Sequence, residues 1–202
     1  MVAKHIDRIR KALNDCVPSV LTADGRVQAA VAIILKEGQE GLEVLLIKRA
    51  ENERDPWSGH IAFPGGRSDD VDANPRETAE RESREELGLD LAQSRYLGRL
   101  SDIVSPRLRI LISVFVYGVD ICPELFLDHD EIADAFWFPL CELHNRERRA
   151  VVNHPWGNRT KQFPALRLCG GNGQPLWGIT YRVLRNLDRI FNRTNVPSHG
   201  LE

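Results

Sequence analysis

The sequence predicts a single domain of the mixed α/β class, in which strands and helices alternate along the chain. Its 202 residues suffice for one domain with a substantial core, and 42% of them are hydrophobic. Some apolar residues form uninterrupted runs, which are typical of buried strands, and others recur at helical spacing. Because no internal repeat or low-complexity linker divides the chain, both kinds of element belong to one fold.

The order of the elements follows from these patterns. An amphipathic helix is expected at the start of the chain, ending before Pro18, with the apolar stripe Val2, Ile6, Ile9 and Leu13. Apolar runs then predict strands over residues 29–35, 44–47, 61–63, 110–119 and 135–138. A closing helix is predicted over residues 176–191, with the stripe Trp177, Tyr181, Leu184, Leu187 and Phe191. Residues 194–202 are expected to form a loose tail.

Composition excludes several classes of protein. With 29 acidic residues against 27 lysines and arginines, the chain lacks the basic excess of most nucleic-acid-binding proteins. Its longest apolar runs reach roughly half of the ~20 residues that a membrane span needs, and its N-terminus interleaves charged and apolar residues. The four cysteines are far apart and form no CxxC pair, which argues against a disulfide framework or a zinc site. We expect a cytoplasmic protein without nucleic-acid or membrane partners, and a homodimer stays open.

The most informative segment is a charged helix predicted over residues 75–87. Asn74 suits the N-cap, Pro75 suits the first helical position, and Glu77 completes a capping-box spacing. Gly88 suits the left-handed residue that commonly ends a helix. Local chemistry therefore specifies both ends of this helix.

Three carboxylates gather on one side of that helix, because Glu82, Glu85 and Glu86 stand at positions i, i+3 and i+4. Like charges at this spacing repel each other, so a compensating cation is expected. Mg²⁺ or Mn²⁺ would suit oxygen ligands and could also hold substrate phosphates. The alternative is a solvated surface helix laced with salt bridges. The preceding Phe63-Pro64-Gly65-Gly66 favours a site, because glycines let the backbone approach a ligand closely.

The same segment resembles the second half of the Nudix hydrolase signature. The matching residues are Arg81-Glu82-Ser83-Arg84-Glu85-Glu86-Leu87-Gly88-Leu89. Asp72 stands at the signature's first acidic position, with one additional residue before Arg81, and Ser83 occupies a usually apolar position. The resemblance implies a mixed β-sheet sandwiched between helices. We expect an N-terminal helix in residues 1–24 packed on the domain, the Nudix domain in residues 25–192, and a tail in residues 193–202.

The resemblance also implies roles for individual residues. The resemblance implies that Glu82, Glu85 and Glu86 are catalytic residues and bind Mg²⁺ or Mn²⁺. Of the three, Glu82 would be the best suited to activate water. The carbonyl of Gly65 and the carboxylate of Glu131, six residues before Trp137, would be further metal ligands. Arg81 would pair with Asp72. The structural positions in the signature are Gly66, Asp72, Arg81 and Gly88.

Two further segments resemble the coenzyme A diphosphatase branch of that family. The upstream match comprises Leu45-Leu46-Ile47-Lys48-Arg49-Ala50, Arg54, Gly59 and Phe63-Pro64-Gly65-Gly66, and the second is Trp177-Gly178-Ile179-Thr180. Ile47 replaces a threonine of the motif, and one residue is inserted before Gly59. Arg49 and Arg54 are candidate phosphate ligands, with surface solubility as the alternative. Trp57 is either a base platform at the rim of the cleft or part of the core.

The basic stretch 144–161 contains five lysines or arginines and one acid. It either meets a nucleotide phosphate or is a solvated loop.

These features predict a metal-dependent diphosphatase that converts coenzyme A or acyl-CoA to 3′,5′-ADP and a phosphopantetheine. The same reaction on ADP-ribose, NADH or nucleoside triphosphates is the alternative, favoured by Ile47 and the inserted residue. A third hypothesis is a non-catalytic nucleotide-binding regulator. Such a regulator would usually have lost the carboxylates, and all three are present.

Overall fold

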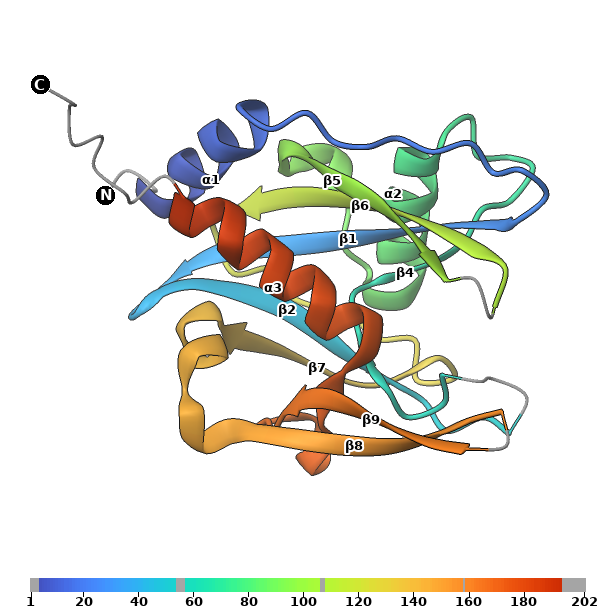
Figure 1. The fold of residues 1–202 in the computed structure, drawn as a ribbon. Helices are drawn as coiled ribbons and strands as arrows, with labels where there is room; N and C mark the ends of the chain where they lie inside the picture. Colours follow the sequence, from blue (N-terminus) through green and yellow to red (C-terminus); the bar gives the residue numbers. More distant parts are fainter. Residues whose placement is uncertain (1–3, 54–56, 106–107, 158, 194–202) are drawn as a thin grey trace, which may run out of the picture.

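The computed structural model describes residues 4–53, 57–105, 108–157 and 159–193, and its centre is a mixed β-sheet (Figure 1). The sheet has the order β3–β2–β1–β6–β5, with β4 paired to β1 and β7 to β2. Only β1 and β6 run parallel, and the other pairs are antiparallel. The strands are β1 (Val27–Gly38), β2 (Gly41–Arg49), β3 (Ile61–Ala62), β4 (Gly65–Arg67), β5 (Arg95–Ser105), β6 (Ile110–Val119) and β7 (Ile132–Pro139).

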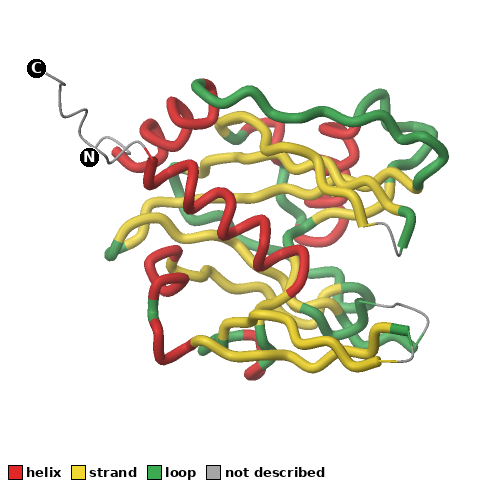
Figure 2. The backbone as a smooth tube through the Cα atoms, viewed as in Figure 1, coloured by secondary structure: helices red, strands yellow, loops and turns green. Residues whose placement is uncertain are grey.

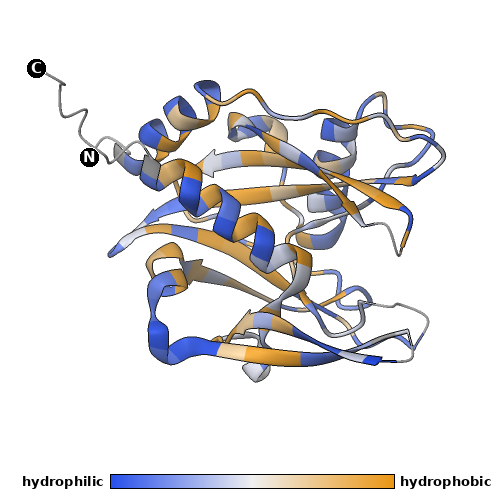
Figure 3. Cartoon of the chain, in the orientation of Figure 1, coloured by the Kyte–Doolittle hydropathy of each residue, from blue (hydrophilic) through white to orange (hydrophobic). Residues whose placement is uncertain are grey.

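Helices cover both faces of this sheet, as the resemblance implies. Because side chains alternate along a strand, Ile33 of β1 packs with α1 (Lys4–Asn14) and α3 (Gly178–Arg193), and Ile34 packs with α2 (Pro75–Leu87). Figure 2 shows α3 crossing the near face of the strands, and Figure 3 shows hydrophobic residues along the central strands. Among the described residues, every helix is too short or too polar to traverse a bilayer.

A second, smaller sheet packs on the α1/α3 face. It consists of β8 (Arg149–Trp156), β9 (Arg159–Leu166) and β10 (Leu176–Trp177), in the order β10–β9–β8. Leu166 and Leu176 face each other in the register and are buried in the core that α1 and α3 share. The short 3₁₀ helices are η1 (Leu91–Gln93), η2 (Leu140–His144), η3 (Arg146–Arg148) and η4 (Gly171–Gly173).

The apolar runs located all five predicted strands, but other strands were missed. Strand β5 gives a weak signal because register shifts against β6 break the alternation of apolar and polar residues. The stretch 144–161 was expected to be a loop, and this was wrong: it forms η3 and most of the β8–β9 hairpin. Most of the hairpin's side chains are exposed, so its backbone pairing left no hydrophobic pattern to read.

The closing helix begins later than predicted. Leu176 and Trp177 form β10 by pairing with Leu166 and Ala165, and the helix starts at Gly178, whose φ of 68° allows the change of direction. Trp177 therefore does not belong to the helical stripe. At the other end of the chain, Ile6, Ile9 and Leu13 pack into the core as a helix. Val2 and the predicted tail 194–202 lie outside the described residues.

Helix α2 has the predicted boundaries. The Asn74 side chain accepts hydrogen bonds from the backbone N–H groups of Arg76 and Glu77, and Gly88 closes the helix at φ 65°. The unusual Ser83 is fully buried, and its hydroxyl donates to the Ala79 carbonyl at 2.7 Å. A serine at this apolar position is therefore tolerated, because its polar group is satisfied within the helix.

Candidate active site

Two consecutive glycines bring the carboxylates of α2 against the edge of strand β4. The backbone N–H of Gly65 donates to Glu86 Oε2 at 2.9 Å. Gly65 has a φ of 143°, and a Cβ there would lie 2.3 Å from the Ala30 carbonyl oxygen. A Cβ on Gly66 would lie 2.5 Å from the carboxylate carbon of Glu82. Glycine at position 65 therefore lets β4 pair closely with β1, and glycine at position 66 leaves room for the Glu82 carboxylate.

Glu86 is the most buried acid of the site, with 2% of its side chain exposed. Its Oε1 has no hydrogen-bond partner among the described residues, although Arg49 Nη1 lies 3.7 Å away. The pKa of Glu86 is raised to about 8, mainly by burial. The charges of Glu82 and Glu131 contribute to the rise, and Gly65 N–H and Arg49 oppose it. The ionised form of Glu86 is therefore disfavoured in this site, and a nearby cation would favour it.

Glu82 and Glu131 face the same region. Burial is the main cause that raises the pKa of Glu82, and repulsion from Glu85 and Glu131 adds to it. Glu131 comes from a distant segment: its carbonyl accepts from Ala50 N–H at 2.7 Å, next to Arg49 at the end of β2. Pairing between β2 and β7 therefore brings Glu131 to the helix carboxylates.

Arg81 connects the helix to the preceding loop. Its Nε lies 2.9 Å from Asp72 Oδ1, and its guanidinium lowers the pKa of that carboxyl well below the usual range. Its Nη1 contacts both Glu82 Oε1 and Glu85 Oε2 at 2.9 Å. Glu85 is 57% exposed and turns toward Arg81. The structure thus brings together Glu82, Glu86 and Glu131, and leaves Glu85 at the rim.

The donor chemistry of this site fits a divalent cation. Within the described residues, no three acidic, histidine or cysteine side chains already form a ready-made metal cage. Arg81 bridges Glu82 and Glu85, so a cation would compete with its guanidinium for their oxygens. The unsatisfied oxygen of Glu86 and the mutual repulsion of its neighbours are what a hard cation would relieve.

The predicted substrate ligands have different outcomes. Arg49 lies at the carboxylates. Trp57 is partly buried and packs against the core shared by α1 and α3, so a base-platform role stays a prediction. Arg54 lies outside the described residues. The sequence predicted no individual role for Thr180. In the structure its hydroxyl donates to the Ile61 carbonyl at 3.1 Å and connects the start of α3 to β3. The Trp177-Gly178-Ile179-Thr180 match was the available signal.

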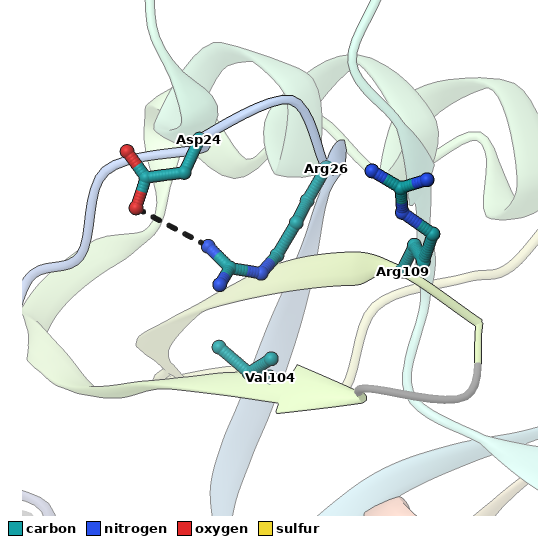
Figure 4. A pocket seen from close by; sticks show the side chains of 4 residues that line it. All are labelled: Asp24, Arg26, Val104 and Arg109. Atoms are coloured by element: carbon teal, nitrogen blue, oxygen red, sulfur yellow. Dashed lines mark hydrogen bonds and ion pairs between the residues drawn. The ribbon is translucent and has the colours of Figure 1, made fainter.

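A separate open depression of about 280 Å³ lies at the start of β1 and the turn of the β5–β6 hairpin (Figure 4). It is lined by Asp24, Arg26, Val104 and Arg109. Arg26 spans the turn before β1, with Nη1 3.4 Å from Asp24 Oδ2. No candidate site residue lines this depression, so it does not belong to the carboxylate site.

Replacing Gly66 with alanine is expected to impair the site far more than the fold. Gly66 has no positive φ, and the atom its Cβ would strike is the end of the flexible Glu82 side chain. Displacement of that carboxylate should lower turnover at the site by about 10- to 100-fold, as loss of a positioning contact commonly does. Steady-state rates and thermal melting measure the two effects. A melting temperature that falls in step with activity would contradict the expectation.

Comparison with known proteins agrees with this geometry. A family model described as the NUDIX domain matches residues 26–157. The chain is 36% identical to a Caenorhabditis elegans protein named peroxisomal coenzyme A diphosphatase, covering 70% of this chain and 61% of that protein. It is 38% identical to the mitochondrial Nudix hydrolase 15 of Arabidopsis thaliana, covering 78% and 56%. The chain thus spans little more than half the length of these two relatives.

Solved structures share the fold at low sequence identity. A MutT/nudix family protein from Enterococcus faecalis superposes with a TM-score of 0.56 at 15% identity, over 95% of this chain and 75% of that one. This likeness supports the mixed sheet between helices that the sequence predicts.

Proposed function

The chain belongs to the Nudix family, and from this premise we propose that it is a divalent-metal-dependent pyrophosphohydrolase acting on coenzyme A or acyl-CoA. The products would be 3′,5′-ADP and a phosphopantetheine. The main support is the acidic set Glu82, Glu86 and Glu131, in which Glu86 is buried, Glu82 is half-buried and Glu131 is exposed. One oxygen of Glu86 has no hydrogen-bond partner among the described residues. Two observations support the substrate: the upstream resemblance around Arg49, and a relative named as a coenzyme A diphosphatase.

The residues of the site suit hydrolysis of a diphosphate. A bound Mg²⁺ or Mn²⁺, held by Glu82, Glu86, Glu131, the rim residue Glu85 and the Gly65 carbonyl, would offset the negative charge of the phosphates and polarise a phosphoryl oxygen. Glu82 is the candidate base, because burial raises its affinity for the proton of an attacking water. Arg49 at the edge of the carboxylates can donate to phosphate oxygens. Arg81 holds the helix against the loop through Asp72.

The alternative substrates remain ADP-ribose, NADH and nucleoside triphosphates, which the departures at Ile47 and before Gly59 favour. Retention of Glu82, Glu85 and Glu86 argues against a non-catalytic regulator. Cytoplasmic location and a homodimer stay predictions, and the two relatives are named as peroxisomal and mitochondrial.

A substrate panel tests the proposal directly. Purified protein with Mg²⁺ or Mn²⁺ would be incubated with coenzyme A, acetyl-CoA, ADP-ribose, NADH and ATP, and the products would be identified by mass spectrometry. We expect 3′,5′-ADP and phosphopantetheine from coenzyme A, at a kcat/KM above that for the other compounds, and no hydrolysis after chelation. Intact coenzyme A alongside cleaved ADP-ribose or NADH would reject the substrate but retain the diphosphatase.

A further inference from the structure

Four aromatic rings from three separate segments meet around Trp177 at the end of β10. The ring centroid of Trp177 lies 5.0 Å from that of His154 in β8, 5.1 Å from that of His60, and 5.6 Å from that of Phe163 in β9. None of the four side chains is fully buried. Such partly exposed, mutually tilted rings offer edges and faces to a further flat ring.

The hairpin that supplies two of these rings is basic. Strands β8 and β9 carry Arg149, Arg159 and Lys161 and contain no acidic residue. Lys161 Nζ lies 5.3 Å from the ring centroid of Phe163, so a positive charge lies beside the aromatic cluster. An anionic group next to a bound ring would be attracted there.

The aromatic cluster is close to the carboxylate site along the chain. The His60 carbonyl accepts from the Arg49 N–H at 3.0 Å, and Arg49 itself lies beside Glu86. Gly65 lies five positions after His60, so their backbones are at most about 18 Å apart. In Figure 1 the β8–β9 hairpin lies below the central sheet, beside the start of α3. The aromatic cluster and the carboxylate site are therefore linked through Arg49 and His60.

We propose that Trp177, together with His60, His154 and Phe163, forms the platform that binds the adenine base of the substrate. This inference rests on the proposed function, because coenzyme A carries an adenine whose ribose bears a 3′-phosphate. The base stacks on the aromatic cluster, and the 3′-phosphate lies toward Lys161 and the basic hairpin. One ligand thereby accounts for both the partly exposed rings and the adjacent positive charge.

Binding of the reaction product tests the platform without requiring turnover. Calorimetric titration with 3′,5′-ADP and, separately, with inorganic pyrophosphate in the presence of Mg²⁺ would compare wild type with Trp177→Leu. We expect the variant to bind 3′,5′-ADP about tenfold more weakly, as expected for loss of one stacking contact, and to bind pyrophosphate as wild type does. Trp177→Phe, which keeps an aromatic ring, should recover most of the affinity.

Matched variants separate stacking from folding. His154→Ala removes a ring from the hairpin and should weaken 3′,5′-ADP binding, whereas Asn153→Ala, at the neighbouring exposed position, should not. His154→Ala decides the question should Trp177→Leu fail to fold. Equal affinity of wild type and His154→Ala for 3′,5′-ADP, or no binding by wild type, would overturn the platform. Binding that depends on these rings in a protein that leaves coenzyme A intact would reject the proposed substrate alone.

Discussion

Replacing Glu86 with glutamine is expected to lower kcat for coenzyme A hydrolysis by about 10²- to 10⁴-fold, the usual range for loss of a catalytic carboxyl group. Glutamine has nearly the same shape, so the hydrogen bond from Gly65 N–H can persist. The variant loses the negative charge that the site would offer to a cation, and its amide group would face Arg49 or the metal unfavourably. Steady-state kinetics over a range of Mg²⁺ and Mn²⁺ concentrations measures the loss.

Glu80→Gln is the matched control for this change. Glu80 lies on the same helix, but its carboxylate contacts the Arg76 guanidinium and the Tyr117 hydroxyl, away from the glycine loop. This variant should keep kcat within a few-fold of wild type, because its contacts maintain the fold only. If Glu86→Gln turned over coenzyme A as fast as Glu80→Gln, the assignment of Glu86 to the metal site would be wrong.

The metal-free protein is expected to become less stable as pH rises from about 5 to 8. The pKa of Glu86 is raised from 4.5 to about 8 in the folded chain, mainly by burial. Between these values the folded state holds a proton that the unfolded state has released, so increasing pH favours unfolding. The stability that depends on protonated Glu86 is fully present below about pH 4.5 and is lost as pH rises through about 8. At its steepest it amounts to about 1.4 kcal/mol per pH unit.

Urea unfolding in chelator across this pH range measures the effect. Glu82 and Glu131 repel a charged Glu86, and Arg49 attracts it, so all three shape the transition. The Glu86→Gln variant cannot ionise here and should show a flatter dependence on pH. Near pH 8, added Mg²⁺ or Mn²⁺ should increase the stability of the wild-type protein and should have little effect on the stability of the variant. Parallel pH dependence in the two proteins would assign the titration to other groups.

Prediction succeeded best where the determinants lie close together in the chain. Helix α2 begins and ends where Asn74 and Gly88 indicate, because capping depends on the conformation and side chain of one or two residues. Uninterrupted apolar runs located β1 and β6, which are covered by helices on both faces. The β8–β9 hairpin was missed because its pairing relies on backbone hydrogen bonds, and these leave little trace in side-chain composition.

For the candidate site, the sequence by itself determined that three glutamates share one side of a capped helix behind a pair of glycines. Only the tertiary structure decided that Glu86 is buried against Gly65 while Glu85 turns outward to Arg81. It also decided that Glu131 joins them through the pairing of β2 with β7. Helical periodicity specifies where a side chain projects around the axis. Strands far away in the chain determine what packs against that side of the helix. They therefore determine which carboxylate loses its water and changes its pKa.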